Sequence, residues 1–140
     1  MGLPDWPSVR ARMLAPKPAL RFTAYAIGKD PLRARTDGEG RLFRDDGAPE
    51  ELTGPGWLLS ALEPRLFAYL DRAEGDVVAR ERTGGRDAIV AEVAGLRREG
   101  GAAFRVWVDE ETGVVIRIER TDDPAPLLVI DGLTVVPPEG

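Results

Sequence analysis

The 140-residue chain contains no cysteine and no histidine, and it also lacks asparagine and glutamine. Without cysteine there can be no disulfide and no thiol nucleophile. Without histidine the commonest general base and a principal metal ligand are missing. Only two serines occur, Ser8 and Ser60, and neither lies in a G-x-S-x-G turn. Catalysis would have to rest on carboxylates, arginine, lysine or tyrosine, so we expect no enzyme, no metal site and no cofactor.

What remains is the composition of a globular protein, with 43% hydrophobic and 31% charged residues. The length fits a single domain over residues 1–140, and no apolar run approaches the ~20 residues that a transmembrane helix needs. A net charge of -5 and scattered arginines argue against nucleic-acid binding. The start has no secretory signal, so we expect a cytoplasmic protein, or a periplasmic or other extracytoplasmic one if the sequence is a trimmed mature form.

The first 44 residues predict an arm followed by strands. Residues 1–19 form a proline-rich arm with one short helix, for which Ser8 is the candidate N-cap. Residues 20–27 alternate, with Leu20, Phe22, Ala24 and Ala26 on one face and Arg21, Thr23 and Tyr25 on the other. Two short strands then meet at Asp37-Gly38, a dipeptide that favours a hairpin turn. The acidic stretch 45–56 is expected to be a loop.

The second half combines one helical segment with a run of strands. Leucines at positions 58, 62, 66 and 70 repeat every four residues and predict a helical insertion over 55–73. After Gly75 the period changes to two, and five strand candidates follow within 76–136, separated by turn residues. Strands, a helical insertion and more strands predict an α+β fold: a strongly curved antiparallel sheet, or incomplete β-barrel, with helices packed in its concave mouth.

The stretch "WVDEETGVVIRIER" (107–120) places three consecutive acids between two apolar arms. Strand parity joins the arms as a hairpin, with Gly113 as the positive-φ residue and Asp109 capping backbone amides. The spacing does not match a calcium loop, and exposed turn acids are poor general acids. We therefore interpret the acids as a solvated turn. Acidic pairs at 45–46, 50–51 and 122–123 receive the same interpretation.

Three pieces of sequence resemble the LolA-like class of bacterial proteins, which contains lipoprotein carriers and RseB-like regulators. They are Pro55–Ser60, Gly85–Ala88 and Val108–Glu119. The resemblance implies a half-barrel whose concave apolar surface holds an acyl chain or another apolar ligand. The implied lining is Phe22, Leu58, Leu62, Leu66, Phe67, Phe104, Val106, Ile116 and Ile118. The alternative is that these side chains form an ordinary solid core.

Trp107 has the opposite strand parity from Phe104 and Val108. If its face is the outer one, Trp107 and Val115 are exposed together and could form a surface for a protein partner. The alternative is that the N-terminal arm covers them.

These observations leave three hypotheses of different classes. The leading one is a non-enzymatic binding module that takes a lipid-like ligand or a protein partner on an apolar concave surface. The second is a structural or regulatory interaction protein that acts through an exposed sheet face or as a homodimer, without a small ligand. The third, a carboxylate-dependent enzyme, is disfavoured by the missing side-chain types.

Overall fold

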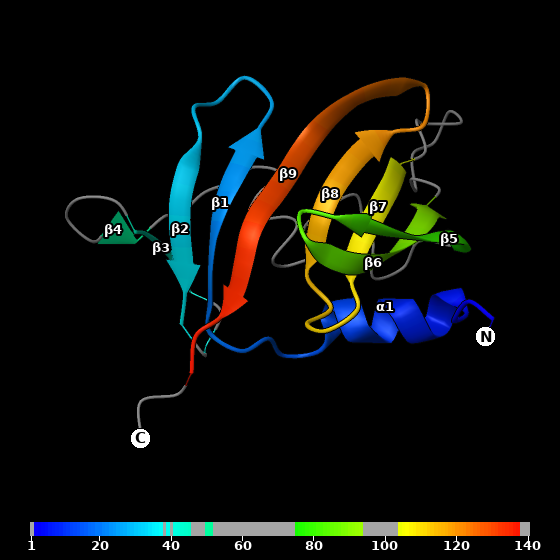
Figure 1. Ribbon diagram of the computed structural model, residues 1–140, viewed down its shortest axis with the longest axis horizontal. Coiled ribbons are helices and arrows are strands. Elements are labelled where there is room, and N and C mark those ends of the chain that lie inside the picture. Colours follow the sequence, from blue (N-terminus) through cyan, green and yellow to red (C-terminus); the bar gives the residue numbers. More distant parts are fainter. Residues whose placement is uncertain are drawn as a thin grey trace.

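The computed structural model describes residues 2–37, 39, 41–45, 50–51, 75–93 and 104–137. These residues contain one helix, α1 (Trp6–Leu14), and a single antiparallel sheet (Figure 1). Its strands are β1 (Leu20–Ala26), β2 (Leu32–Thr36), β3 (Leu42–Arg44), β4 (Glu50–Glu51), β5 (Gly75–Thr83), β6 (Arg86–Val93), β7 (Phe104–Asp109), β8 (Val115–Arg120) and β9 (Asp123–Val135). The order across the sheet is β4-β3-β2-β1-β9-β8-β7-β6-β5. Among the described strands the ladder is open, as the predicted incomplete barrel requires.

The alternating pattern of β1 is confirmed, because Leu20, Phe22 and Ala24 are buried while Arg21 and Tyr25 are exposed. The five strands predicted after residue 75 are also present as a consecutive antiparallel meander. β9 joins the two groups of strands because it pairs with both β8 and β1. The last strand of the chain therefore lies in the middle of the sheet (Figure 1).

Three acids predicted to lie in loops belong to strands, whereas Asp122 lies in a turn as predicted. Glu50 and Glu51 pair with β3, which adds a short ninth strand to the eight that the pattern predicted. Asp123 begins β9 opposite Arg120. Neither stretch shows apolar alternation, so only pairing with a neighbouring strand makes it extended.

Helix α1 begins earlier than the sequence indicated, and the Ser8 N-cap prediction is wrong. Asp5 is the cap: its Oδ1 accepts a hydrogen bond from the Ser8 backbone N–H at 2.9 Å. Pro7 in the first turn is compatible with this register, because the first amides of a helix have no intrahelical partner. The earlier start brings Trp6 onto the buried face beside Val9 and Met13.

Two glycines allow α1 to approach the sheet closely. A Cβ on Gly113 would lie 2.5 Å from the carbonyl oxygen of Arg12, and one on Gly75 would lie 2.8 Å from Cδ2 of Trp6. Gly113 also has φ = 76°, as predicted for the β7–β8 turn. The helix therefore lies directly under that turn (Figure 1), and glycine at position 113 serves both the turn and the helix contact.

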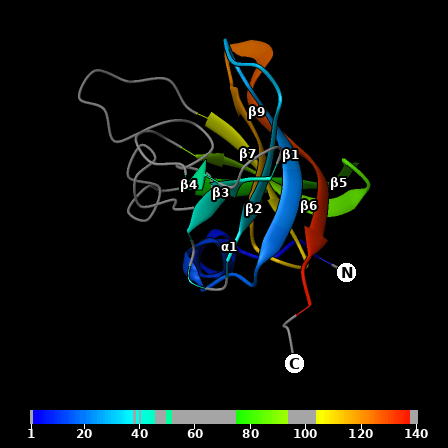
Figure 2. The ribbon, with the colours of Figure 1, turned by 90° about the vertical axis from the view of Figure 1, so that its left-hand side faces the viewer.

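The sheet curls at the β5–β6 end. Figures 1 and 2 show the β5–β6 hairpin turning across the sheet toward β9. A Cβ on Gly84 in this hairpin would lie 3.4 Å from the Ile130 carbonyl oxygen, and Arg86 Nη1 donates to the Leu133 carbonyl at 3.0 Å. The curl helps to bury both faces of β7, where Phe104 and Val106–Asp109 are all buried.

The predicted helical insertion over 55–73 lies outside the described residues, so helices in the concave mouth remain a prediction. Among the described residues, no helix is long and apolar enough to cross a membrane.

Candidate functional site

The sheet residues expected to line an apolar cavity lie in one buried cluster. Phe22, Phe104, Val106, Ile116 and Ile118 are each at most 6% exposed. Val106 and Ile118 are direct neighbours across β7 and β8. Leu58, Leu62, Leu66 and Phe67, the helical half of the predicted lining, lie outside the described residues. The structure thus brings the sheet half of the predicted lining together.

The expected exposure of Trp107 and Val115 is wrong, because Trp107 is 6% exposed and Val115 is fully buried. The guanidinium of Arg117, opposite Trp107 on β8, lies over the indole ring with its Cζ 5.4 Å from the ring centroid. The N-terminal arm packs on the other face, since Val108, the next residue along β7, lines a pocket with Val9 of α1. Trp107 is a core residue capped by an arginine.

Asp109, interpreted from the sequence as a solvated turn acid, is 1% exposed. Its capping role is confirmed: Oδ2 accepts hydrogen bonds from the Thr112 backbone N–H at 2.9 Å and from Thr112 Oγ1 at 2.6 Å. The Gly113 N–H closes the turn on the Asp109 carbonyl at 2.8 Å. A buried carboxylate needs a cation as well as these donors, and that cation comes from another strand.

The cation is Arg86, at the start of β6. Its Nε lies 2.8 Å from Asp109 Oδ1 and its Nη2 lies 3.2 Å from Asp109 Oδ2, while Nη2 also contacts Glu111. The hydrogen bond to Asp109 is the main reason that the pKa of Arg86 is raised. Arg86 and Asp109 come from two of the three pieces that carry the family resemblance, "GRDA" and "VDEETG". Nothing in the local pattern of either piece could reveal that Arg86 and Asp109 pair with each other.

This cluster holds two strands and a turn together. The two oxygens of Asp109 are occupied by a guanidinium, a hydroxyl and an amide. Over the cluster lies an open polar hollow of about 510 Å³. Among the described residues, no group of three or more acids is arranged to hold a metal ion.

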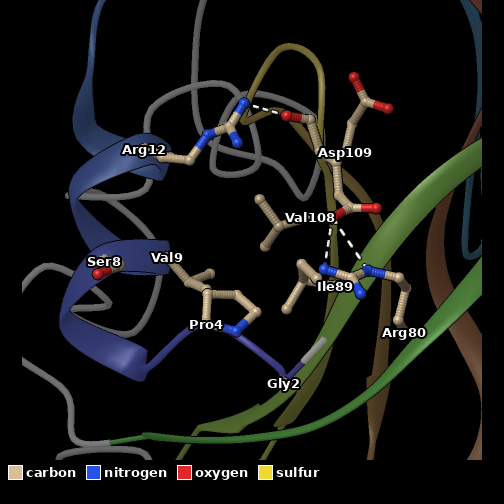
Figure 3. A pocket seen from close by; sticks show the side chains of 10 residues that line it. Gly2, Pro4, Ser8, Val9, Arg12, Arg80, Ile89, Val108 and Asp109 are labelled. Carbon is tan, nitrogen blue, oxygen red and sulfur yellow. Dashed lines mark hydrogen bonds and ion pairs between the residues drawn. The ribbon is translucent and has the colours of Figure 1, made fainter.

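A smaller pocket of about 270 Å³ lies between α1 and the sheet (Figure 3). Its apolar wall is formed by Pro4, Val9, Ile89 and Val108, which come from the arm, α1, β6 and β7. The other residues that line it are Gly2, Ser8, Arg12, Arg80, Asp109 and Glu110. Sequence reasoning missed this pocket, because its wall comes from segments about 100 residues apart.

Ion pairs and hydrogen bonds hold the rim of the pocket. Arg80 Nε and Nη2 both lie 3.1 Å from Glu110 Oε1, and Arg12 Nη2 donates to the Glu110 carbonyl oxygen. Glu110 therefore connects β5, the β7–β8 turn and α1. An apolar wall inside a fixed polar rim is the usual composition of a site that binds an apolar group in one orientation.

No profile of a known protein family matches the chain, and no curated protein matches it. Solved structures do match it. A crystal structure of MucB aligns with 96% of this chain at TM-score 0.58 and 17% identity. MucB in complex with MucA(peri) aligns with 93% of this chain at TM-score 0.53 and 19% identity. The Pseudomonas aeruginosa MucA/MucB complex aligns with 96% of this chain at TM-score 0.56 and 18% identity.

The chain spans 59%, 54% and 57% of the three matched chains, so it corresponds to a little over half of each. Identities below one fifth establish common architecture and nothing finer. The chain therefore shares the fold of MucB at a distant level of similarity.

Proposed function

We propose that this chain is a non-enzymatic binding module that engages a protein partner. The observation that carries the proposal is the likeness to MucB in complex with MucA(peri), which extends over 93% of this chain. The fold has thus been seen in a protein that binds another protein. An extracytoplasmic location belongs to the same proposal, because the fragment named in that complex is MucA(peri).

The pocket beneath α1 is the place where we expect a partner to anchor. Its volume of about 270 Å³ suits one apolar side chain better than a whole drug-sized ligand, for which pockets of roughly 300–1,000 Å³ are usual. Interfaces draw most of their binding energy from a few side chains buried in such pockets. Val9, Ile89 and Val108 would contact the anchor, and the fixed Arg80–Glu110 rim would exclude water around it.

The test uses peptides selected from a random display library on the immobilised chain. We expect a set of related peptides that share one apolar anchor. Ser8 is exposed and lines the pocket, so Ser8→Leu should fill the pocket and weaken binding at least about tenfold, the effect of losing one anchor. Ala11→Leu is the matched control, because Ala11 is an exposed residue of α1 that does not line the pocket.

Unrelated peptides, or peptides that bind Ser8→Leu as tightly as the wild-type chain, would refute the pocket as the anchor site. Sedimentation of the free chain provides a further check. A stable dimer that Ser8→Leu disrupts would identify the partner as a second copy of the chain.

A lipid-like ligand on the concave face is the second candidate. Its support is the single buried cluster that contains Phe22, Phe104, Val106, Ile116 and Ile118, together with the sequence resemblance to lipoprotein carriers. Native mass spectrometry of the purified chain should then show a co-purified acyl compound. A bare polypeptide mass, unchanged after incubation with fatty acids, would eliminate this candidate while leaving protein binding intact.

A further inference from the structure

Two arginines of the sheet lie over aromatic rings. The Arg117 Cζ lies 5.4 Å from the centroid of the Trp107 ring, and the Arg35 Cζ lies 4.8 Å from the centroid of the Phe43 ring. In each case the arginine and the ring are opposite each other on neighbouring strands. The cationic face of a guanidinium is attracted to the face of an aromatic ring. The chain therefore forms the same contact in two separate places.

Each of these arginines is also paired with a carboxylate through its Nε. Arg117 Nε lies 2.6 Å from Glu119 Oε2, and Arg35 Nε lies 3.6 Å from Asp45 Oδ1. The carboxylate contacts the edge of the planar guanidinium and the ring contacts its face, so the two contacts do not compete. The pairing at the edge also restrains the side chain, which lowers the entropy cost of placing a ring on the face.

Arg80 has the carboxylate without the ring. Its Nε and Nη2 both lie 3.1 Å from Glu110 Oε1, whereas no aromatic ring of the described residues lies over its guanidinium. Arg80 instead lines the pocket beneath α1 (Figure 3), and the described residues that line this pocket include no aromatic side chain. Beside Arg80 the pocket thus takes the place that a ring has beside Arg35 and Arg117.

The pocket is large enough for a ring. An apolar cavity of about 150 Å³ is enough to bind benzene, and this pocket has a volume of about 270 Å³. Its apolar wall, formed by Pro4, Val9, Ile89 and Val108, would pack against the ring while Arg80 contacts the ring face.

The charges around the pocket favour neither an acidic nor a basic occupant. The pocket and the adjoining cluster contain three positive and three negative side chains: Arg12, Arg80, Arg86, Asp109, Glu110 and Glu111. Arg82 and Asp87, which line the adjoining hollow, form a further balanced pair. A charged occupant would compete with these existing pairs, whereas a neutral ring can use the guanidinium face and leave the Arg80–Glu110 pair intact.

We propose that the pocket beneath α1 selects an aromatic side chain of the protein partner, whose ring lies over the guanidinium face of Arg80. This inference rests on the proposed function and adds the chemical class of the anchor. An aliphatic anchor of similar size would fill the pocket without making the contact with Arg80.

The probes are phenol, which is the ring of a tyrosine side chain, and cyclohexanol, its saturated counterpart of similar size. Methyl NMR of Ile89 and Val108 in the full chain follows the binding of each probe to the pocket. Phenol should bind about fivefold more tightly, the factor that corresponds to one cation–π contact at a partly exposed site. Phenol should also move the Arg80 Nε–H resonance to lower frequency, because only an aromatic ring has a ring current.

Arg80→Met keeps an unbranched apolar stem and removes the guanidinium. Phenol should then bind about fivefold more weakly, while cyclohexanol should bind as it does to the wild type and so show that the pocket is intact. Arg82→Met is the matched control, because Arg82 belongs to the same strand and does not line this pocket. The control should keep the preference for phenol.

Three results would overturn the proposal. They are equal affinities of the two probes for the wild type, a preference for phenol that persists in Arg80→Met, and an Arg80 resonance that phenol does not move. The last result is measured on the wild type, so it decides the question even if Arg80→Met loses the pocket.

Failure here can be distinguished from failure of the proposed function. Library peptides that lose affinity for Ser8→Leu but share an aliphatic anchor would keep the binding module and reject the aromatic anchor. Phenol that prefers the pocket, combined with peptides that bind Ser8→Leu as tightly as the wild type, would make the pocket a small-molecule site and overturn its assignment to a partner.

Discussion

Arg86 and Asp109 form a two-point ion pair between β6 and the end of β7, with Nε to Oδ1 at 2.8 Å and Nη2 to Oδ2 at 3.2 Å. Arg86 also reaches β9 through the Leu133 carbonyl. One side chain therefore fastens the curled hairpin, the β7–β8 turn and the central strand. The Asp109 side chain is 1% exposed, so removing Arg86 would leave a buried carboxylate without its cationic partner.

Replacing Arg86 by Met should destabilise the fold by about 3 kcal/mol, because it leaves a buried carboxylate without its cation. Urea unfolding measures the change. Arg82→Met is the matched control: its pair with Asp87 has side chains 67% and 63% exposed, and such pairs contribute roughly 0–1 kcal/mol. Equal losses in the two variants would show that the Asp109 charge is compensated in another way.

Gly113→Ala should cost more stability than Gly85→Ala. Both glycines have φ = 76°, so both substitutions incur a left-handed backbone penalty of about 1–2 kcal/mol. Only at position 113 would the new Cβ meet a neighbour, the Arg12 carbonyl oxygen at 2.5 Å, whereas nothing lies within 4 Å at Gly85. Hydrogen exchange should show loss of protection in α1 for the first variant alone. Equal protection would contradict the close packing of α1.

Trp107→Ala should destabilise the chain by about 3–5 kcal/mol, the usual cost of removing a buried aromatic side chain. Ile27→Ala, at a position that is 53% exposed, should stay within about 0.5 kcal/mol of the wild type. Thermal unfolding distinguishes the two. A loss of stability at Trp107→Ala as small as that of Ile27→Ala would contradict the burial of the Trp107 ring.

The cap of α1 should respond to acid. Hydrogen bonds from Ser8, first from its side chain and then from its backbone N–H, lower the pKa of Asp5 below the ordinary value of 3.8. A lowered folded-state pKa means that the stabilising contribution is complete above about pH 4 and is lost as the pH falls through the folded-state pKa. The melting temperature advantage of wild type over Asp5→Asn should therefore shrink below pH 4.

NMR titration of the Asp5 carboxyl carbon provides the matching local measurement. In Ser8→Ala the pKa of Asp5 should rise toward 3.8, because the largest cause of the shift has been removed. An unchanged value in this variant would show that the backbone amide alone determines the cap.

The period-two strands were predictable because their signal is local. Alternation along β1 and the spacing of the β5–β9 meander required only side-chain parity and turn residues. Gly113 was predictable for the same reason, since a positive-φ position favours glycine whatever surrounds it. The N-cap was predicted at Ser8, three residues after the observed cap at Asp5. Both residue types are good N-caps, so their capping propensities could not decide between the two positions.

The candidate site was less predictable. Asp109 looked exposed because turn acids usually are, and only the return of β6 supplies Arg86 to a buried carboxylate. Trp107 looked like an outer residue because parity separates two faces, but the curled sheet buries both. The pocket beneath α1 depends on which segments become neighbours.

By itself the sequence determined where strands run, where the β7–β8 turn closes, and which chemistries are unavailable to a chain without histidine or cysteine. Those properties follow from residue type and periodicity within about ten positions. The tertiary structure decided which charges are buried and which aromatic ring is covered. Burial and pairing depend on contacts between distant segments, and these arise only when β9 inserts between β1 and β8 and the hairpin curls over it.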